Sequence, residues 1–124
     1  MRQGAEWEMA VRSYLEGLGW NILVSNYHAP GGEIDIIAEE RIGQEPTLVF
    51  VEVKARSRTA HGSPLSAVDS HKQKRIFSTA RYYLSENSQG INEPSCRFDV
   101  AEVWIQPDGK ARIELRRGIF WEES

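Results

Sequence analysis

Hydrophobic and polar positions follow two different periods along the chain. Apolar residues recur every three to four positions over residues 4–18 and again from about Leu65 to Asn87, which predicts two helices. Runs rich in β-branched and aromatic residues predict strands at residues 20–27, 33–40, 47–54, 97–106 and 111–116. Turn-forming Gly, Pro and Asp residues separate several of these runs. The resulting order, α-β-β-β-α-β-β, favours an α/β fold in which helices flank a mixed sheet.

Each predicted helix carries a charged residue close to its apolar stripe. In the first helix, Glu6 falls at the edge of a stripe formed by Trp7, Ala10, Val11, Tyr14 and Leu18. In the second helix, Lys72 falls within a stripe formed by Leu65, Val68, Ile76, Ala80 and Tyr83. A lysine at such a position extends outward into solvent or reaches toward a bound phosphate, and the pattern leaves both interpretations open.

The second and third strands are expected to pair as a hairpin around Gly43-Gln44. Strand alternation places Glu52 and Lys54 on one face, and it places Val49, Val51 and Val53 on the other face together with Ile34 and Ile36. A hairpin that is symmetric about its turn sets Asp35 opposite Glu52 and Glu33 opposite Lys54. The pattern therefore predicts two carboxylates and a lysine on one side of the sheet.

Two adjacent carboxylates repel each other unless a cation lies between them. Mg²⁺ binds through one or two carboxylates together with water and phosphate oxygens, and it can activate a water for attack on a phosphodiester. A neighbouring lysine can orient that water or stabilise charge on the phosphate. The simpler interpretation is a half-exposed hairpin whose charges only pair across the strands, because short acid-x-Lys strings are common. Asp99, on a later strand, is interpreted as a structural acid, with support of a metal site as the alternative.

Composition limits the class of protein. The chain has 124 residues, of which 40% are hydrophobic and 27% charged, as expected for one folded domain over residues 1–124. A single cysteine excludes an intrachain disulfide and a multi-cysteine zinc site. With no signal-like or membrane-spanning apolar run, we expect a cytoplasmic protein that does not bind membranes.

Charge is distributed unevenly along the chain. The net charge is −3, but residues 54–81 contain seven Lys and Arg residues and one acid, Asp69, which gives this segment a net charge of +6. A basic block on an acidic protein can bind nucleic-acid phosphate, or it can be a solvated helix face next to a basic loop.

Several motifs together resemble a known family. They are GAE at residues 4–6, GEIDIIA at 32–38, VFVEVKAR at 49–56, AV at 67–68 with Lys72, and RFDV at 97–100. In this order, from Gly4 to about Val103, they resemble the YraN-type uncharacterised bacterial family. That family is similar to the restriction-endonuclease-like PD-(D/E)xK superfamily, particularly the archaeal Holliday junction resolvases.

The resemblance implies a restriction-endonuclease-like mixed sheet with helices on both faces and an active site at the hairpin. By position, Asp35 matches the metal-binding Asp of the superfamily, while Glu52 and Lys54 match its (D/E)xK acid and lysine. Glu6 matches the helix-borne acid of the resolvases, and Lys72 matches a helix lysine of the family. The chain departs from the family pattern at His28, where an Arg is frequent, and at the pair His61-Gly62, which replaces a more aromatic pair.

Two functional hypotheses follow. In the first, the protein is a Mg²⁺- or Mn²⁺-dependent endonuclease acting on DNA, branched DNA included, and a homodimer would suit a symmetric junction. Its metal ligands would be Glu6, Asp35 and Glu52, and Lys54 would assist the attacking water. Its phosphate contacts would be Arg56, Arg58 and Lys72. In the second, motivated by the acidic net charge, the same fold is a nucleic-acid-binding or protein-interaction module that does not catalyse hydrolysis.

Overall fold

The computed structural model describes residues 5–57, 68–87 and 94–121. Its elements are α1 (Ala5–Gly17), β1 (Asn21–Ala29), β2 (Gly32–Ile42), β3 (Glu45–Arg56), α2 (Ser70–Asn87), β4 (Ser95–Ile105) and β5 (Ala111–Phe120). The α/β class and the order α-β-β-β-α-β-β are therefore confirmed. Neither helix in this part of the chain is both long and apolar enough to cross a membrane.

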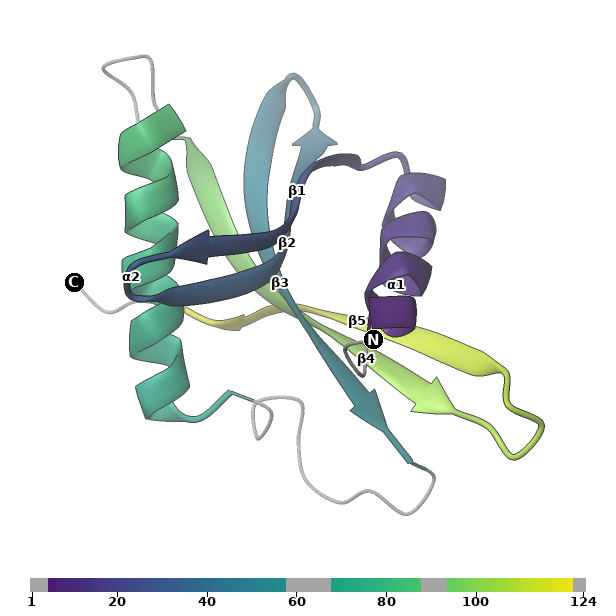
Figure 1. The fold of residues 1–124 in the computed structure, drawn as a ribbon. Coiled ribbons are helices and arrows are strands. Elements are labelled where there is room, and N and C mark those ends of the chain that lie inside the picture. The colour runs from purple at the N-terminus through teal and green to yellow at the C-terminus, as the bar shows by residue number, and fades with distance from the viewer. Residues whose placement is uncertain (1–4, 58–67, 88–93, 122–124) are drawn as a thin grey trace.

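The five strands form one sheet in the order β1-β2-β3-β4-β5. Neighbouring strands are antiparallel, except that β3 and β4 run parallel. A parallel pair needs a long crossover because the chain must return to the starting end of the sheet, and α2 lies in this crossover. Helices α1 and α2 lie on opposite faces of the sheet, so the molecule has three layers (Figure 1).

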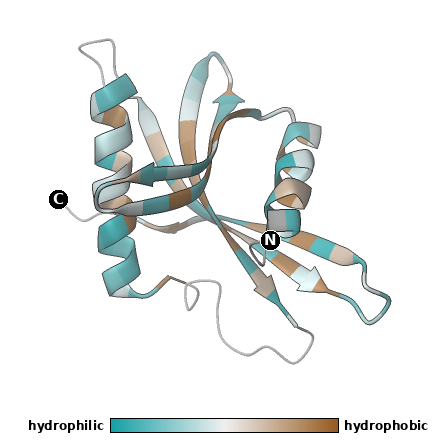
Figure 2. Ribbon diagram, viewed as in Figure 1, coloured by the Kyte–Doolittle hydropathy of each residue, from teal (hydrophilic) through white to brown (hydrophobic). Residues whose placement is uncertain are grey.

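Each helix covers its own hydrophobic core. The core beneath α2 contains Ile34, Ile37, Leu48, Phe50, Val68, Ile76, Phe77, Ala80, Tyr83, Val100 and Phe120. The core beneath α1 contains Val11, Leu15, Trp20, Ile36, Ala38, Val49, Val51, Ala101 and Val103. The central strands supply apolar side chains to both cores, and hydrophobic residues are prominent along them (Figure 2). Burial on both faces explains why their sequences are nearly continuous apolar runs.

The buried face of α1 is rotated relative to the predicted stripe. Val11 and Leu15 are fully buried, whereas Tyr14 and Leu18 are exposed. Glu8 lies on the buried face and is 8% exposed, while Glu6 is exposed. Because of this rotation, the acid that α1 directs toward the sheet is Glu8 and not Glu6.

Helix α2 begins at Ser70, five residues later than the predicted start at Leu65. The reason is a cap: the Lys72 backbone N–H donates a hydrogen bond of 2.8 Å to Asp69 Oδ1. Asp at this position accepts a hydrogen bond from a helix N–H that has no partner within the helix, and it therefore favours a helix that begins at the next residue. The predicted residues 65–67 lie outside the described part of the chain.

The β2–β3 hairpin has the predicted register, with pairs running from Ile42 and Glu45 at the turn to Ile36 and Val51. Beyond Ile36, β2 continues to pair with β1 but no longer with β3. Its end lies beside α2 instead, and the two strands diverge visibly in Figure 1. The divergence places Ile34 in the core beneath α2, which corrects the expectation that Ile34 and Ile36 share a face.

The close approach of β2 to α2 depends on Gly32. A Cβ added at Gly32 would lie 2.9 Å from Thr79 Oγ1, and that hydroxyl donates a hydrogen bond of 2.7 Å to the Arg75 carbonyl. We therefore expect Gly32→Ala to lower the free energy of unfolding by about 1–3 kcal/mol through overpacking. Gly31→Ala is the matched control because its Cβ would meet Ser78 Oγ at an ordinary 3.5 Å. Urea denaturation of both variants tests the prediction, and equal losses would contradict it.

Candidate active site

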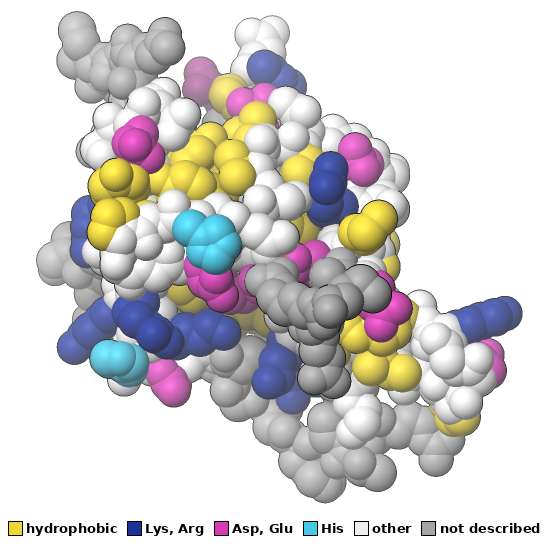
Figure 3. Space-filling view, in the orientation of Figure 1, with side chains coloured by type: hydrophobic (Ala, Val, Ile, Leu, Met, Phe, Trp, Pro, Cys, Tyr) yellow, Lys and Arg dark blue, Asp and Glu magenta, His cyan; other side chains and the backbone are white. Residues whose placement is uncertain are grey.

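A cleft of about 990 Å³ opens where β2 and β3 separate. Its walls come from α1, the β1–β2 turn, β2, β3 and the beginning of α2. The charged residues that line it are Glu8, Glu33, Asp35, Glu52, Lys54, Lys72 and Arg75. Acidic side chains gather in the middle of the face between the two helices, with Lys and Arg side chains on the α2 side (Figure 3). The cleft therefore combines buried negative charge with a basic wall.

Asp35 lies one residue beyond the last β2–β3 pair. Its Oδ2 accepts a hydrogen bond of 2.8 Å from the backbone N–H of Val53. The carboxylate thus replaces the backbone acceptor that β2 no longer supplies, so the strands separate without leaving this donor unsatisfied. The same bond fixes the orientation of the Asp35 side chain at the floor of the cleft.

Glu52 is a buried acid of the cleft, with 6% of its surface exposed. Its Oε2 lies 3.6 Å from Lys72 Nζ, while Oε1 is buried with no hydrogen-bond donor against it among the described residues. In its protonated form, Glu52 hydrogen-bonds to Asp35. Burial and the neighbouring charge of Asp35 raise the pKa of Glu52 from the ordinary value of 4.5 to about 8, although Lys72 acts in the opposite direction. The predicted proximity of Asp35 and Glu52 is thus present.

Lys54 lines the same cleft and is exposed. The expected pair between Lys54 and Glu33 does not form, because the β2–β3 ladder ends at Ile36. Glu33 lies opposite His28 of β1 instead, with 3.3 Å between His28 Nδ1 and Glu33 Oε2 at the exposed rim. Among the described residues, Lys54 forms no ion pair that would hold it away from a ligand in the cleft.

Arg56 is not among the residues that line the cleft. Its side chain is buried, and its Nε lies 2.6 Å from Glu102 Oε2. Arg116 Nε donates a bond of 2.8 Å to the other oxygen of Glu102. Both oxygens of Glu102 are therefore engaged by arginine side chains. Arg56 thus forms a buried ion pair, and its contact with phosphate stays a prediction; Arg58 lies outside the described residues.

Helix α1 supplies Glu8 to the cleft, and the exposed Glu6 is not among the lining residues. The sequence did not single out Glu8 because the predicted apolar stripe of this helix passes through Tyr14 and Leu18. The spacing of Glu8, Val11 and Leu15, at intervals of three and four residues, was the available signal.

Within residues 5–57, 68–87 and 94–121, no three His, Cys, Asp or Glu side chains form a ready-made metal site. Asp35 and Glu52 nevertheless fit the smaller donor set of Mg²⁺, which takes one or two carboxylates and completes its shell with water and phosphate oxygens. The unpartnered Glu52 Oε1 is a hard oxygen of the kind that such a cation prefers.

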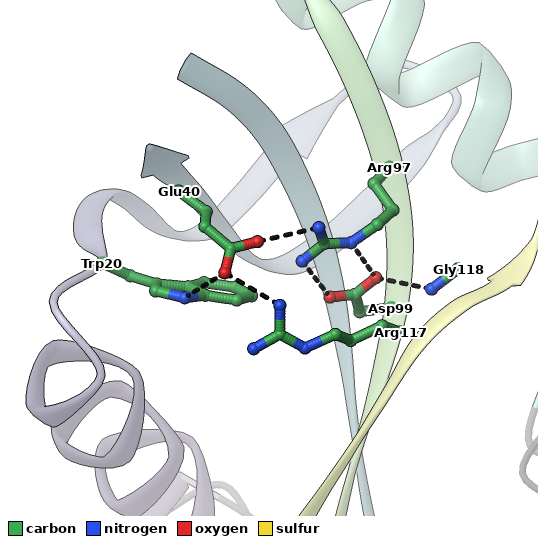
Figure 4. Close-up of polar contacts among 6 residues, drawn as sticks. All are labelled: Trp20, Glu40, Arg97, Asp99, Arg117 and Gly118. Atoms are coloured by element: carbon green, nitrogen blue, oxygen red, sulfur yellow. Dashed lines mark hydrogen bonds and ion pairs between the residues drawn. The ribbon is translucent and has the colours of Figure 1, made fainter. Parts of the chain in front are cut away.

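Asp99 has a structural role, as the sequence interpretation favoured. It is fully buried, and both of its oxygens accept hydrogen bonds from Arg97, at 2.9 and 3.0 Å. The Gly118 N–H donates a further bond of 2.9 Å to the same carboxylate (Figure 4). These donors fully occupy Asp99.

The same cluster links β2, β4 and β5 with Trp20, which precedes β1. Glu40 forms an ion pair with Arg97 at 2.8 Å, and its other oxygen accepts hydrogen bonds from Arg117 at 2.8 Å and from Trp20 Nε1 at 3.1 Å (Figure 4). The two guanidinium groups also lie 5.5 and 5.6 Å from the centre of the Trp20 ring, within cation–π range. Paired in this way, the charges contribute to the fold and not to the cleft.

Comparison with known proteins finds related chains that match over nearly the whole length of this one. The model of uncharacterised protein family UPF0102 matches residues 7–103. A UPF0102 protein of Moorella thermoacetica is 41% identical over 120 residues, covering 96% of this chain and 95% of the relative. A relative from Symbiobacterium thermophilum is 40% identical over 119 residues and covers 96% of both chains. In Chlorobium limicola, a further UPF0102 protein is 39% identical over 126 residues.

The chain belongs to the uncharacterised protein family UPF0102. The resemblance inferred from the sequence motifs is thereby confirmed at the level of the family.

The raised pKa of Glu52 predicts a pH-dependent stability in cation-free buffer. Between pH 4.5 and about 8 the folded protein retains a proton on Glu52 that the unfolded chain releases, so the free energy of unfolding falls as pH rises across this window. Glu52→Gln lacks this contribution. We expect the variant to gain stability relative to the wild type by on the order of a few kcal/mol from acid to alkaline pH. Urea titrations at a series of pH values measure the difference, and a constant difference would refute the pKa assignment.

Arg56 and Arg116 both contact Glu102, but their different burial predicts different losses of stability when each arginine is replaced. Arg56→Met leaves a buried carboxylate with one partner fewer, so we expect a loss of about 2–4 kcal/mol in the free energy of unfolding. Arg116 is 42% exposed, and Arg116→Met should cost about 1 kcal/mol or less. Chemical denaturation compares the two variants. Weakened DNA binding by Arg56→Met at unchanged stability would show instead that Arg56 contacts phosphate.

Proposed function

We propose that this protein is a divalent-cation-dependent endonuclease of the PD-(D/E)xK type that hydrolyses phosphodiester bonds of DNA. The observation that carries the proposal is the pairing of Asp35 with the buried Glu52 where β2 and β3 separate, with Lys54 in the same cleft. Adjacent, incompletely satisfied carboxylates are costly to fold, and perturbed groups of this kind concentrate at functional sites.

Asp35 and Glu52 would hold Mg²⁺ or Mn²⁺. Asp35 is already oriented by the Val53 N–H, and Glu52 presents an oxygen that has no donor among the described residues. When bound, the cation supplies a Lewis acid that polarises the phosphate and makes a nucleophilic water available. Glu52 must release its proton before it can act as a ligand, so cation binding and deprotonation of Glu52 are coupled.

Other residues of the cleft suit the reaction of a charged ester. Lys54 is exposed to the cleft and is placed to orient a water or to stabilise negative charge that develops on the phosphate. Glu8 adds an acceptor from α1 that can hold a water from the opposite wall. Lys72 and Arg75, from α2, supply positive charge for a non-bridging phosphate oxygen.

A polymeric substrate is favoured by the basic surface beside the cleft. Helix α2 contributes Lys72 and Arg75 to the wall of the cleft, and its first turn contains no acidic residue. This positive charge contributes salt-sensitive binding to a phosphate backbone. The same surface would serve a binding module that does not hydrolyse DNA, which makes turnover the property to measure.

We expect metal-dependent cleavage that requires Asp35. Supercoiled, linear, single-stranded and four-way-junction DNA would each be incubated with Mg²⁺, Mn²⁺ or chelator. Asp35→Asn should reduce cleavage to the level seen with chelator, because a cation ligand is lost. Lys54→Ala should reduce the rate by about 100-fold or more, as for removal of one group that stabilises the transition state.

Two glutamates on α1 provide a matched comparison. Glu8→Gln should lower the cleavage rate, whereas Glu6→Gln, two residues away on the exposed face, should leave it unchanged. Cleavage that persists in Asp35→Asn would refute the assignment. Folded protein that binds DNA in a salt-sensitive manner but cleaves none of the panel would establish the binding module instead.

A further inference from the structure

Lys72, in the first turn of α2, makes an unusual contact for a partly exposed side chain. Its Nζ reaches across the cleft to within 3.6 Å of Glu52 Oε2, although 43% of the Lys72 side chain is exposed to solvent. The glutamate is almost fully buried, at 7% side-chain exposure. A flexible cation that could be solvated thus pairs with an acid that could not.

The position of Lys72 conflicts with a bound cation. A divalent ion held by Asp35 and Glu52 and an ammonium group on the same Glu52 repel each other strongly in a partly buried site. Lysine has four rotatable bonds and a compact charge, so it can move while the helix stays in place. The backbone of Lys72 is held by its hydrogen bond to the Asp69 cap, which confines the movement to the side chain.

Lys72 can bind a phosphate together with a second positive side chain on the same helix face. Arg75 lies three residues further along α2, where side chains are neighbours on a helix, and it lines the same cleft. A phosphate oxygen entering the cleft can therefore meet Lys72 and Arg75 together, and charge-assisted bonds to phosphate are the strong ones.

We propose that Lys72 is an exchangeable counterion: its ammonium group pairs with the ionised form of Glu52 in the absence of a divalent cation, and it turns to the substrate phosphate when a cation binds. The inference rests on the proposed cation site and adds a coupling to it. Cation binding frees the ammonium group for phosphate, and phosphate draws it away from Glu52, so each ligand strengthens the binding of the other. Lys72 is thus a positioning residue that orders cation and substrate binding.

The first test measures Mg²⁺ binding by calorimetry without DNA. Lys72→Met should bind Mg²⁺ about three- to tenfold more tightly than the wild type, because a competing positive charge has been removed. Removing the Lys72 charge also favours protonation of Glu52, which opposes Mg²⁺ binding. The gain for Mg²⁺ is larger, because electrostatic repulsion increases with the charge of the ion. Lys74→Met is the control, since it removes the same charge from an exposed position outside the cleft and should bind Mg²⁺ as the wild type does. Lys72→Arg keeps the charge and should retain the weaker binding.

The second test measures coupling. Fluorescence anisotropy with a short DNA duplex, with and without Ca²⁺ as a hard cation of the same ligand preference, gives the factor by which the cation strengthens DNA binding. We expect a factor of about five or more in the wild type and in Lys74→Met, and a factor near one in Lys72→Met. Unfolding midpoints of all variants establish that the fold is intact.

The outcomes separate the two proposals. If the folded wild type and all three variants bind no divalent cation, the proposed cation site is wrong. If the wild type binds Mg²⁺ but Lys72→Met binds it equally or more weakly, the counterion role is wrong and the cation site stands. Equal tightening by Lys72→Met and Lys74→Met would also overturn the counterion role, because it would reflect the general charge of the helix.

Discussion

Beyond the Ile36–Val51 pair, β2 and β3 stop sharing backbone hydrogen bonds, and the N–H groups left along β3 need other acceptors. Asp35 meets this need with its side chain, which accepts the bond from Val53. The opening between the strands, the orientation of Asp35 and its closeness to Glu52 all follow from this substitution of a carboxylate for a backbone carbonyl. The cleft is thus built into the pairing of the sheet and does not depend on a separate loop.

Three buried acids of the protein differ in how completely their carboxylate oxygens are hydrogen-bonded. Asp99 and Glu102 each accept hydrogen bonds or ion pairs on both carboxylate oxygens. Glu52 is buried almost as deeply, but one oxygen has no hydrogen-bond donor in the described part of the chain and the other lies 3.6 Å from the Lys72 ammonium group. Buried polar groups are ordinarily satisfied, so an exception calls for a reason. The proposed cation site rests on this oxygen of Glu52.

The sequence was sufficient wherever local rules decide the outcome. The turn at Gly43-Gln44 set the hairpin register, and the register brought Asp35 to Glu52. The α1 interface was harder to predict, because Tyr14 and Leu18 resemble core residues in a helical wheel although the structure leaves them exposed. The partner of Arg56 was out of reach for another reason. Glu102 lies on a strand that pairs with β3 in parallel across a long crossover, and no local pattern specifies that register.

The charge cluster around Asp99 and Glu40 bears on how the chain folds during synthesis. Its donors Arg117 and Gly118 belong to β5, which leaves the ribosome after every other strand of the sheet. Until then, two carboxylates that the finished fold buries or half-buries lack part of their hydrogen bonding, and this opposes closure of an incomplete sheet. A nascent chain that ends before β5 should therefore remain open, which delays the commitment of the cores to their final packing until the last edge of the sheet is available.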